Sequence, residues 1–598
     1  MERATARGES RPILALVAVV LVAAGVYAGA AQLVSTPRVH PDEHIYAGAG
    51  ASLAEGEGLT LRGGEYGLGP VYPAILATAL ALAGDRATAY HLYKAANGIL
   101  FALAAIPIFL LARRLLSPWW SVGVAAASVA IPSSMYASVV MTESTSYLAY
   151  SLAVYAIVLA LERPTVPRQL AVLATVALAY ATRAQFAVLF VAFLAALAIV
   201  WAISPEREPL RPALRRLWPS LGALALGGIA LLARTVATGS SPAGDYDVLF
   251  RGYNPLDIAR WGAYHLADLE IYLAVVPIAV SPIVVVALWR RAREGSTRSA
   301  AFLAAFLMLN GGMLFVTAAF ASTEFGFDRL HDRNIFYLAP LWLILFAVWL
   351  ADGLPRPLVA TAIGAAAALA LPLYLPFRHI AGDVGVDVVP SALWARLRDL
   401  LDGAEPLSGR RVFALVVVLL VVAAILLPRH LRWALPAAVV AGFAVTSVLA
   451  WERLIDAPEN SVFEGGLERA WIDERIPSDA EVTKLYLVSS DCPASALTWH
   501  GLYLSEFFNE RVERAAYIGD SIPDGLPIER VDVQGDGKLS TVSQDLSAEY
   551  VYTQPGIKLD GERVASGTAA DLVLWRVGGP VRVLGASSNA DLRTRDCA

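Results

Sequence analysis

The chain has 598 residues, of which 57% are hydrophobic and only 17% are charged, with a mean hydropathy of +0.56 and a formal net charge of -5. Soluble globular chains are nearer half apolar and a quarter charged, so this composition excludes an ordinary soluble protein. The net charge is small and no basic patch with interleaved aromatic residues occurs, so we predict no nucleic-acid partner.

Long runs of Ala, Leu and Val recur from position 11 to position 450, each long enough to cross about 30 Å of hydrocarbon. The first run is too long for the core of a signal peptide and lacks a clean cleavage site, so we predict a retained span. We predict about 13 transmembrane helices in all: 11–34, 88–112, 119–140, 144–161, 168–183, 185–203, 217–237, 269–289, 299–321, 335–351, 355–376, 411–428 and 431–450. Residues 71–83 form a shorter run, which we place on the outer surface as an interfacial helix.

Arginine residues predict the orientation of these spans, because cytoplasmic loops are enriched in Lys and Arg. Arg3, Arg7 and Arg11 precede the first span, and Arg113 and Arg114 mark the next arginine-rich loop. The N-terminus is therefore predicted to be cytoplasmic and the C-terminus extracytoplasmic, in an integral protein of the cell (plasma) membrane. The long loops 35–87, 239–268, 322–334 and 377–410 then lie outside and hold most of the polar residues.

The composition changes after residue 450. Three of the four lysines lie beyond this point, and long apolar runs stop. Residues 481–488 alternate like a strand, 502–508 are typical of a helix, and 514–518, 550–553 and 571–577 are typical of strands. We therefore predict two domains: a membrane-embedded domain, 1–450, and a soluble extracytoplasmic α/β domain, 451–598.

The chain has only two cysteines, Cys492 and Cys597, and both lie in the predicted outer domain. An oxidising compartment favours a disulfide between them. Two unpaired thiols, one of them on a frayed C-terminal tail, are the alternative, and the sequence does not decide between them.

Asp42 and Glu43 form an adjacent carboxylate pair a few residues after the first span. Acidic groups at the mouth of a bilayer are costly if they only pack, and they are suited to accept a proton or to hold a cation. The alternative is a surface-loop pair or a helix N-cap, for which Asp is well suited.

The order of motifs around this pair resembles that of the membrane glycosyltransferases of the C-type superfamily, which include protein O-mannosyltransferases, aminoarabinose transferases and actinobacterial arabinosyl- and mannosyltransferases. The resemblance is strongest over residues 1–200 and extends in topology to about residue 450. The motifs that carry it are Pro41-Asp42-Glu43, Gly69-Pro70-Val71-Tyr72-Pro73, Lys94 before Asn97-Gly98, Ala112-Arg113-Arg114, Ile131-Pro132, Met141-Thr142-Glu143-Ser144 and Thr182-Arg183-Ala184-Gln185.

The resemblance implies an inverting glycosyltransferase that takes a sugar from a polyprenyl-phosphate donor on the outer leaflet. The acceptor is a glycan, a lipid or a protein. Asp42 is implied as the base, and Glu43 and Glu143 would orient the substrate or a cation. The candidates for holding the donor, most of them cationic, are Lys94, Arg183, Gln185, Arg329 and Arg333. Lys94 departs from the family, in which Arg is frequent, and loses the bidentate fork.

This assignment agrees with elementary chemistry. A sugar hydroxyl is a poor nucleophile, and a carboxylate at hydrogen-bond distance accepts its proton as attack proceeds. A lipid phosphate leaving group needs charge stabilisation more than an acid, which paired arginine donors provide. The sequence identifies no cofactor with certainty, and the acids are compatible with a divalent cation.

Each candidate also has a structural interpretation. Glu143 could cap the helix that follows it, and Lys94 and Arg183 could extend to the membrane interface. His44, His91, His265 and His331 could bind a metal with the acids, but ordinary hydrogen-bonded histidines are more frequent. The alternative function is a transporter or flippase of lipid-linked glycans, which would show internal repeats and polar residues at the membrane midplane.

Overall fold

The structure is a computed structural model that describes residues 2–205, 209–238, 253–381, 387–389, 391–400, 406–457, 462, 468–488, 495–519, 522, 526–566 and 570–596. The chain forms two compact units. Unit 1 contains residues 1–28, 97–137 and 142–452, and unit 2 contains residues 29–96, 138–141 and 453–598. Cys492, Cys597 and the predicted loop residues Asp245, Tyr246 and Asp247 lie outside the described residues.

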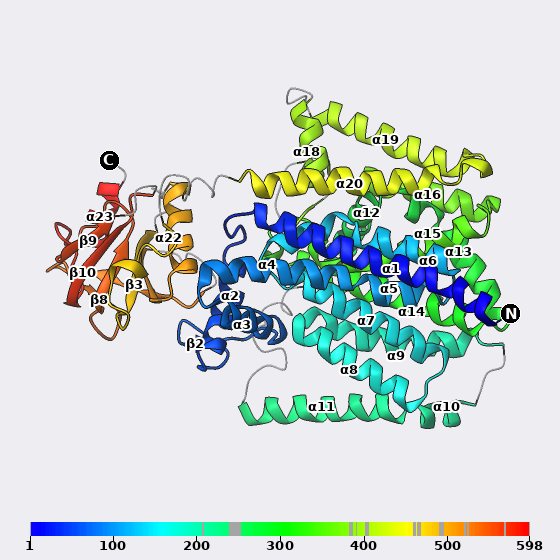
Figure 1. Ribbon diagram of the computed structural model, residues 1–598, viewed down its shortest axis with the longest axis horizontal. Helices are drawn as coiled ribbons and strands as arrows, with labels where there is room; N and C mark the ends of the chain where they lie inside the picture. The colour runs from blue at the N-terminus through cyan, green and yellow to red at the C-terminus, as the bar shows by residue number, and fades with distance from the viewer. Residues whose placement is uncertain are drawn as a thin grey trace. The chain divides into compact units, whose positions relative to one another are not determined.

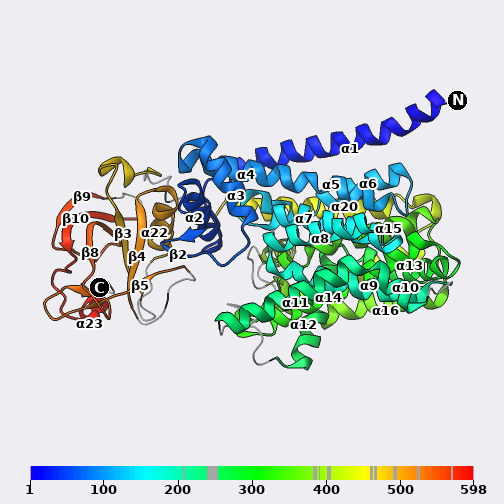
Figure 2. The same cartoon turned by 90° about the horizontal axis from the view of Figure 1, so that it is seen from below.

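Unit 1 is helical, and its long helices lie side by side (Figures 1 and 2). α7 packs on α8, α9 on α14, and α13 on α16. Its helices are α1 (Glu2–Ala30), the second half of α4 (Arg86–Leu103), α5 (Ala105–Ala112), α6 (Pro118–Val129), α7 (Glu143–Glu162), α8 (Val166–Thr182), α9 (Val188–Ile203), α10 (Leu210–Arg216), α11 (Trp218–Thr238), α12 (Pro255–Tyr272), α13 (Val276–Arg293), α14 (Thr297–Ala321), α15 (Ala339–Ala351), α16 (Leu358–Tyr374), α17 (Phe377–Ala381), α18 (Ser391–Leu400), α19 (Pro406–Leu426) and α20 (Ala434–Ile455).

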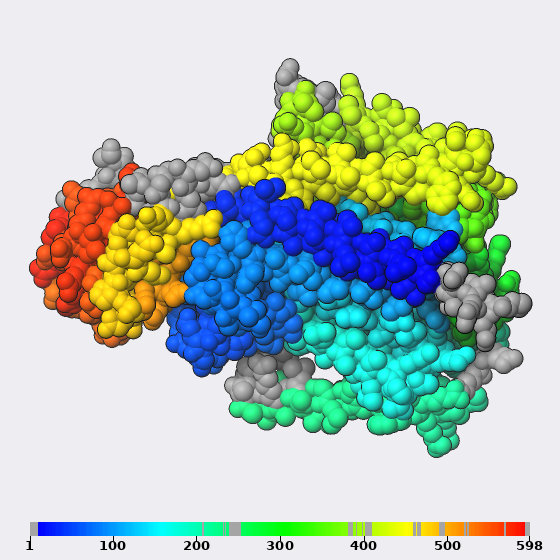
Figure 3. Space-filling view, viewed as in Figure 1, coloured from blue at the N-terminus to red at the C-terminus, as the bar shows by residue number. Residues whose placement is uncertain are grey.

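Within the described residues, seven helices are long and apolar enough to cross a membrane, or eight if a bent pair counts as one span. α1 lies on the surface of unit 1 in the space-filling view (Figure 3). Its Leu14, Leu21 and Val22 side chains are each more than 60% exposed. Large apolar side chains on the outside of a helical unit suit contact with lipid rather than water, which agrees with an integral membrane protein.

The predicted helices agree with the structure in most of their bounds, but the count of 13 spans stays a prediction, because several apolar helices are shorter than 18 residues. Two spans differ. The predicted helix 119–140 ends at Val129, and a 3-10 helix, η2 (Pro132–Ser138), follows at the proline.

The predicted span 269–289 lies in a bent pair of helices. α12 already begins at Pro255, inside the predicted outer loop, and meets α13 at 106°. Ala274 and Val275 have positive φ at the bend, so the helix cannot continue through them.

Unit 2 contains a six-stranded mixed sheet of order β5-β4-β3-β8-β10-β9. β3 runs parallel to β4 and β8, whereas β10 runs antiparallel to β8 and β9. The predicted strands and the helix α22 (Ala496–Phe508) all occur. The strands are β3 (Val482–Val488), β4 (Val512–Gly519), β5 (Glu529–Arg530), β8 (Ser547–Thr553), β9 (Glu562–Ser566) and β10 (Val573–Pro580); β6 (Asp532–Val533) and β7 (Leu539–Ser540) form a separate hairpin.

Side chains alternate across this sheet and pack into two cores. Leu485 and Leu487 of β3 face one core, and Tyr486 faces the other. The core that contains Tyr486 also includes residues of α22. It further includes residues of the first predicted outer loop, from α3 (Val71–Ala83) and the start of α4. Residues 29–96 and 453–598 therefore share one hydrophobic core. The division into a membrane-embedded domain, 1–450, and an extracytoplasmic domain, 451–598, stays a prediction.

Gly48 and Gly50 of α2 (Asp42–Ala54) provide a test of the packing of α2 on α3. A Cβ atom at Gly50 would lie 2.8 Å from Leu76 Cβ and 3.3 Å from the Pro73 carbonyl oxygen, which are rigid, whereas at Gly48 it meets only the end of the Leu61 side chain. We expect Gly50→Ala to lower the free energy of unfolding by about 1–3 kcal/mol through overpacking. Gly48→Ala should leave the free energy of unfolding nearly unchanged, because the higher helix propensity of Ala offsets the contact with the flexible end of Leu61. Thermal unfolding of both variants in detergent is the measurement, and equal midpoints would contradict this packing.

Candidate functional site

The Asp42–Glu43 pair begins α2 in unit 2. Both carboxylates lie in the first helical turn, where the helix dipole favours negative charge. Pro41 occupies the N-cap position and makes no side-chain capping bond, so neither acid acts as the N-cap itself. Asp42 is partly exposed, whereas Glu43 is completely buried.

The buried Glu43 carboxylate holds three backbone N–H groups. Oε1 accepts hydrogen bonds from the amides of Arg38 and Val39, and Oε2 accepts one from the Val140 amide at 2.7 Å. Burial raises the pKa of the Glu43 carboxyl group, although the three N–H donors act against this shift. Both oxygens are engaged, so Glu43 fixes the backbone on which Asp42 stands.

Lys94 also makes contacts that hold backbone in place. Its completely buried ammonium donates to the carbonyl oxygens of Ala31, at 2.9 Å, and of Val34, and lies 4.1 Å from the centre of the Tyr90 ring. The ammonium would have to leave two carbonyl partners to reach a phosphate. These contacts support a structural role at the end of the first helix.

His40 and His44 form a hydrogen-bonded pair on either side of the acids. His44 Nε2 lies 2.7 Å from the Tyr503 carbonyl oxygen, so this nitrogen carries a proton. The other nitrogen, Nδ1, must then accept, and His40 Nδ1, at 3.1 Å, is the donor. The pair therefore connects the N-terminus of α2 to α22.

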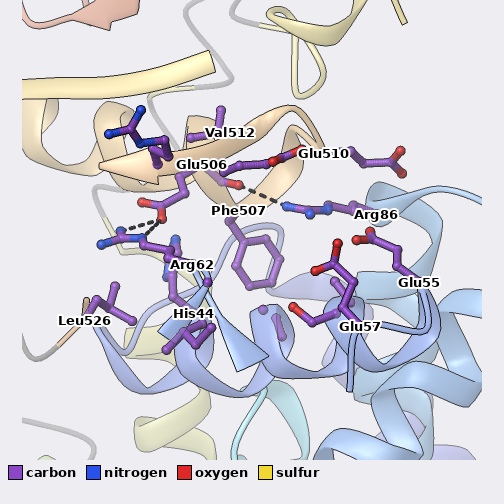
Figure 4. Close-up of a pocket in the computed structure, with 18 of the residues that line it drawn as sticks. His44, Glu55, Glu57, Arg62, Arg86, Glu506, Phe507, Glu510, Val512 and Leu526 are labelled. Carbon is purple, nitrogen blue, oxygen red and sulfur yellow. Dashed lines mark hydrogen bonds and ion pairs between the residues drawn. The ribbon is translucent and has the colours of Figure 1, made fainter. Parts of the chain in front are cut away.

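Glu506 of α22 is the centre of a second set of contacts in unit 2. Its carboxylate forms ion pairs with Arg62, which follows α2 in the same loop, and with Lys484 of β3, whose side chain is only 1% exposed. These two cations lower the pKa of the Glu506 carboxyl group despite its burial. Beside this cluster is a cavity of about 470 Å³ that Arg62, Glu506 and His44 help to line (Figure 4).

Glu143 and Arg183 meet in unit 1. Glu143 is the first residue of α7, and its buried Oε1 forms an ion pair with Arg183, which follows α8. Arg183 also donates to Asn334 Oδ1 at 2.9 Å and to the Tyr337 hydroxyl at 3.4 Å. Glu143 Oε2 has no hydrogen-bond partner among the described residues, so this buried ion pair keeps one unused acceptor.

Arg329 and Arg333 converge on Asp387, also in unit 1. The Arg329 guanidinium lies 2.7 Å from one Asp387 oxygen, and Arg333 Nε lies 2.9 Å from the other. Asp332 accepts a hydrogen bond from the Val389 amide at 2.6 Å. Burial, and then the charges of Asp268 and Asp387, raise the pKa of the Asp332 carboxyl group. Both arginines therefore already have a carboxylate partner.

The sequence identified some of these residues and missed others. It named Glu143, Arg183, Arg329 and Arg333 as candidates for one site without predicting which of them pair, and Asp268, Asn334, Tyr337 and Asp387 carried no recognisable signal. Gln185, expected beside Arg183, has a buried Nε2 without a partner among the described residues. The His40–His44 spacing was the one available signal for the histidine pair.

The other histidines that the sequence singled out are hydrogen-bonded. His91 Nδ1 lies 2.7 Å from Gln32, His265 Nδ1 lies 2.8 Å from the Trp261 carbonyl, and His331 Nε2 lies 3.0 Å from the Gly326 carbonyl. Across the part of the chain that the structure describes, no group of three or more His, Cys, Asp or Glu side chains could hold a metal ion.

Two crystal structures of ArnT from Cupriavidus metallidurans are similar over nearly the whole chain, covering 95% and 96% of this chain and 98% of ArnT. The apo structure has a TM-score of 0.52 and 15% identity; the structure bound to undecaprenyl phosphate has a TM-score of 0.54 and 16% identity. At this identity the likeness establishes the fold. No protein-family profile and no curated protein matches the chain.

The histidine pair predicts a pH dependence of stability. Burial lowers the pKa of His44 to about 4, and lowers the pKa of His40 as well. An unfolded histidine titrates near pH 6.5, so the unfolded chain takes up protons first as the pH falls. The free energy of unfolding should therefore decrease from about pH 6.5 towards pH 4, by up to about 3 kcal/mol for His44, and should not depend on this group above pH 7.

Denaturant unfolding of the purified protein between pH 7.5 and 4.5 measures this dependence. The difference between wild type and His44→Gln isolates the histidine from the titrating acids. His430→Gln, at an exposed histidine, is the control. If the free energy of unfolding depends on pH equally in wild type and in His44→Gln, the histidine pair does not titrate on unfolding.

Proposed function

We propose that the protein is a membrane glycosyltransferase that moves a sugar from a polyprenyl-phosphate donor to a hydroxyl of its acceptor, with inversion at the anomeric carbon. The observation that carries this proposal is the position of Asp42, on a helix start held by the buried Glu43, in a chain with the fold of ArnT. The ArnT structure bound to undecaprenyl phosphate supports a polyprenyl-phosphate donor.

Asp42 is the residue that we assign as the general base. It accepts the proton of the acceptor hydroxyl while that oxygen attacks the anomeric carbon and the bond from this carbon to the phosphate oxygen breaks. The polyprenyl phosphate leaves with the electron pair of this bond. Glu43 is adjacent, but its two oxygens already bind three N–H groups, so we assign it to positioning Asp42 rather than to proton transfer.

Arg183 is the cation that we assign to the donor phosphate. It lies in the Thr182-Arg183-Ala184-Gln185 motif that carries the family resemblance. Its donors now bind Glu143 and Asn334, and a phosphate that displaced these partners would meet the same planar, bidentate guanidinium. Arg329 and Arg333 share Asp387 and stay candidates for the phosphate, whereas Lys94 binds backbone carbonyls and is a weaker candidate.

We further propose that the reaction takes place outside the cytoplasm, with the N-terminus cytoplasmic and residues 451–598 extracytoplasmic. The arginine-rich loops support this orientation. A reporter enzyme fused after residue 455 should be active only in the extracytoplasmic compartment, and cytoplasmic activity would refute it.

A transporter or flippase of lipid-linked glycans is the second candidate, and the bent α12–α13 pair favours it. Discontinuous helices with polar groups at the break are typical of transporters. Glu270, next to the bend, is completely buried, and both its carboxylate oxygens lack hydrogen-bond partners among the described residues. A transporter would move lipid-linked sugar across vesicles without forming a glycosidic bond.

Asp42→Asn tests the enzyme proposal. The substitution keeps the size of the side chain and removes its basicity, so sugar transfer should fall by at least about 100-fold, while donor binding and thermal stability stay near wild type. The assay uses purified protein and a radiolabelled polyprenyl-phosphate sugar. Transfer at the wild-type rate would exclude Asp42 as the base.

Glu43→Gln is the matched comparison for this experiment. The amide has a single acceptor oxygen, so at least one of the three N–H groups loses its partner, at a cost of about 1–3 kcal/mol. This variant should therefore lose thermal stability, which Asp42→Asn should not. Sugar translocation across proteoliposomes that survives in Asp42→Asn, with no transfer in wild type, would favour the transporter.

Arg183→Lys tests the phosphate-binding role. Lysine keeps the charge opposite Glu143 but loses the paired arms, so the KM for the donor should rise about tenfold or more, with a smaller change in kcat. Arg114→Lys is the control, because Arg114 makes a similar two-armed contact with Glu162, away from the proposed site residues. A donor KM that changes equally in both variants, or in neither, would contradict the assignment of Arg183.

A further inference from the structure

The cavity of unit 2 has features that the proposed reaction at Asp42 does not use. It has a volume of about 470 Å³, within the range of small-molecule sites, and its lining comes from α2, α4, α22 and β4. Figure 4 shows the Phe507 ring between the Arg62–Glu506 pair on one side and Glu55 and Glu57 on the other.

The lining has a large excess of carboxylates. Five of its glutamates form no ion pair within the described residues: Glu55, Glu57, Glu481, Glu510 and Glu513. Its cations are already engaged, because Arg62 pairs with Glu506 and Arg514 pairs with Glu529. Arg86 donates to the carbonyl oxygens of Glu506 and Asn509, at 3.3 and 3.0 Å, rather than to a carboxylate.

These acids affect one another's ionisation. Partial burial raises the pKa of Glu55; the charge of Arg86 acts against this shift, and the charges of Glu57 and Glu510 add to it. Partial burial, and then the charges of Glu481, Glu57 and Glu55, raise the pKa of Glu513. A concave surface lined by one sign of charge concentrates its field and attracts ions of the opposite sign.

The other lining groups indicate the size and kind of ligand. Phe507 and Tyr93 are nearly fully buried and contribute aromatic surface to the wall, as in sites for organic ligands. The volume exceeds what a single hydrated ion needs and suits a sugar ring. Carboxylates accept hydrogen bonds from both hydroxyl and ammonium groups, whereas they repel phosphate and carboxylate groups.

We infer that this cavity binds a sugar unit that carries an amine. The inference rests on the proposed function and extends it: Asp42 does not line the cavity, so the cavity would hold a unit of the acceptor glycan other than the one that receives the sugar. Binding of an amino sugar to the cavity does not depend on catalysis at Asp42, so the two proposals fail separately.

Binding of three simple probes to the purified full-length protein tests this inference. Glucosamine, glucose and glucose 6-phosphate have similar rings and differ in charge. We expect glucosamine to bind about tenfold more tightly than glucose, from several contacts with exposed carboxylates, and glucose 6-phosphate not to bind measurably. Raising the ionic strength from about 0.05 to 0.5 M should remove most of this preference by screening.

The double variant Glu55→Gln/Glu513→Gln should reduce the preference for glucosamine to about threefold or less. Both side chains are exposed, so the fold should be retained, and the thermal midpoint checks this. Glu562→Gln, an exposed glutamate on β9 outside the cavity, is the control and should leave the preference unchanged. Equal affinity for glucosamine and glucose, preferential binding of glucose 6-phosphate, or a preference that the double variant retains would overturn the inference.

Asp42→Asn separates this inference from the proposed function. This variant should bind glucosamine like wild type while failing to transfer sugar. Selective glucosamine binding by a wild-type protein that transfers no sugar would leave the cavity assignment intact and refute the glycosyltransferase. Sugar transfer by a wild-type protein that does not bind glucosamine selectively would support the glycosyltransferase and refute the cavity assignment.

Discussion

The arrangement of the candidate site depends on one buried carboxylate. Glu43 accepts backbone hydrogen bonds from residues 38 and 39 on one side and from Val140, about one hundred residues away in the chain, on the other. A buried N–H group without a partner costs as much as a lost hydrogen bond, so removing this acceptor would destabilise both segments at once. The neighbouring Asp42 directly precedes Glu43 in the chain, and the two adjacent acids differ in burial and contacts, which is why we propose different roles for them.

The buried Glu506 carboxylate likewise holds together segments of unit 2 that are far apart in the chain. It joins Arg62 of the first outer loop to Lys484 of the central strand β3, while aromatic residues of α3, α4 and α22 fill the core beside it. Breaking such a buried ion pair by removing one partner leaves an uncompensated charge, which is strongly destabilising. The loop that carries Asp42 and the C-terminal sheet are therefore parts of one compact unit, and a change in one is expected to reach the other through shared packing.

In unit 1, polar groups gather where helices are interrupted. Arg183 follows the end of α8, Asn334 and Tyr337 lie in short 3-10 turns, and Asp268 and Glu270 precede the bend between α12 and α13. An interrupted helix leaves backbone groups and side chains that lipid cannot satisfy, so such sites are confined to the protein interior. This constraint applies to a transferase and to a transporter alike, which is why the chemistry at Asp42, rather than the shape of unit 1, separates the two.

The sequence by itself determined the class of protein, most helix and strand positions, and the acidic pair at the start of α2, because hydrophobic runs, period-two alternation and charge placement are local patterns. It also indicated Glu143 and Arg183, which stand at helix ends that composition reveals. Only the tertiary structure decided that Glu43 is the carboxylate that holds backbone amides, because one of its three partners, Val140, lies about one hundred residues away in the chain. The same holds for the bend at Ala274, for Asp387 between two arginines, and for the acidic cavity, whose walls come from segments more than 400 residues apart. Contacts of that range leave no periodic trace in the chain, since they arise from packing and hydrogen-bond satisfaction in the folded protein.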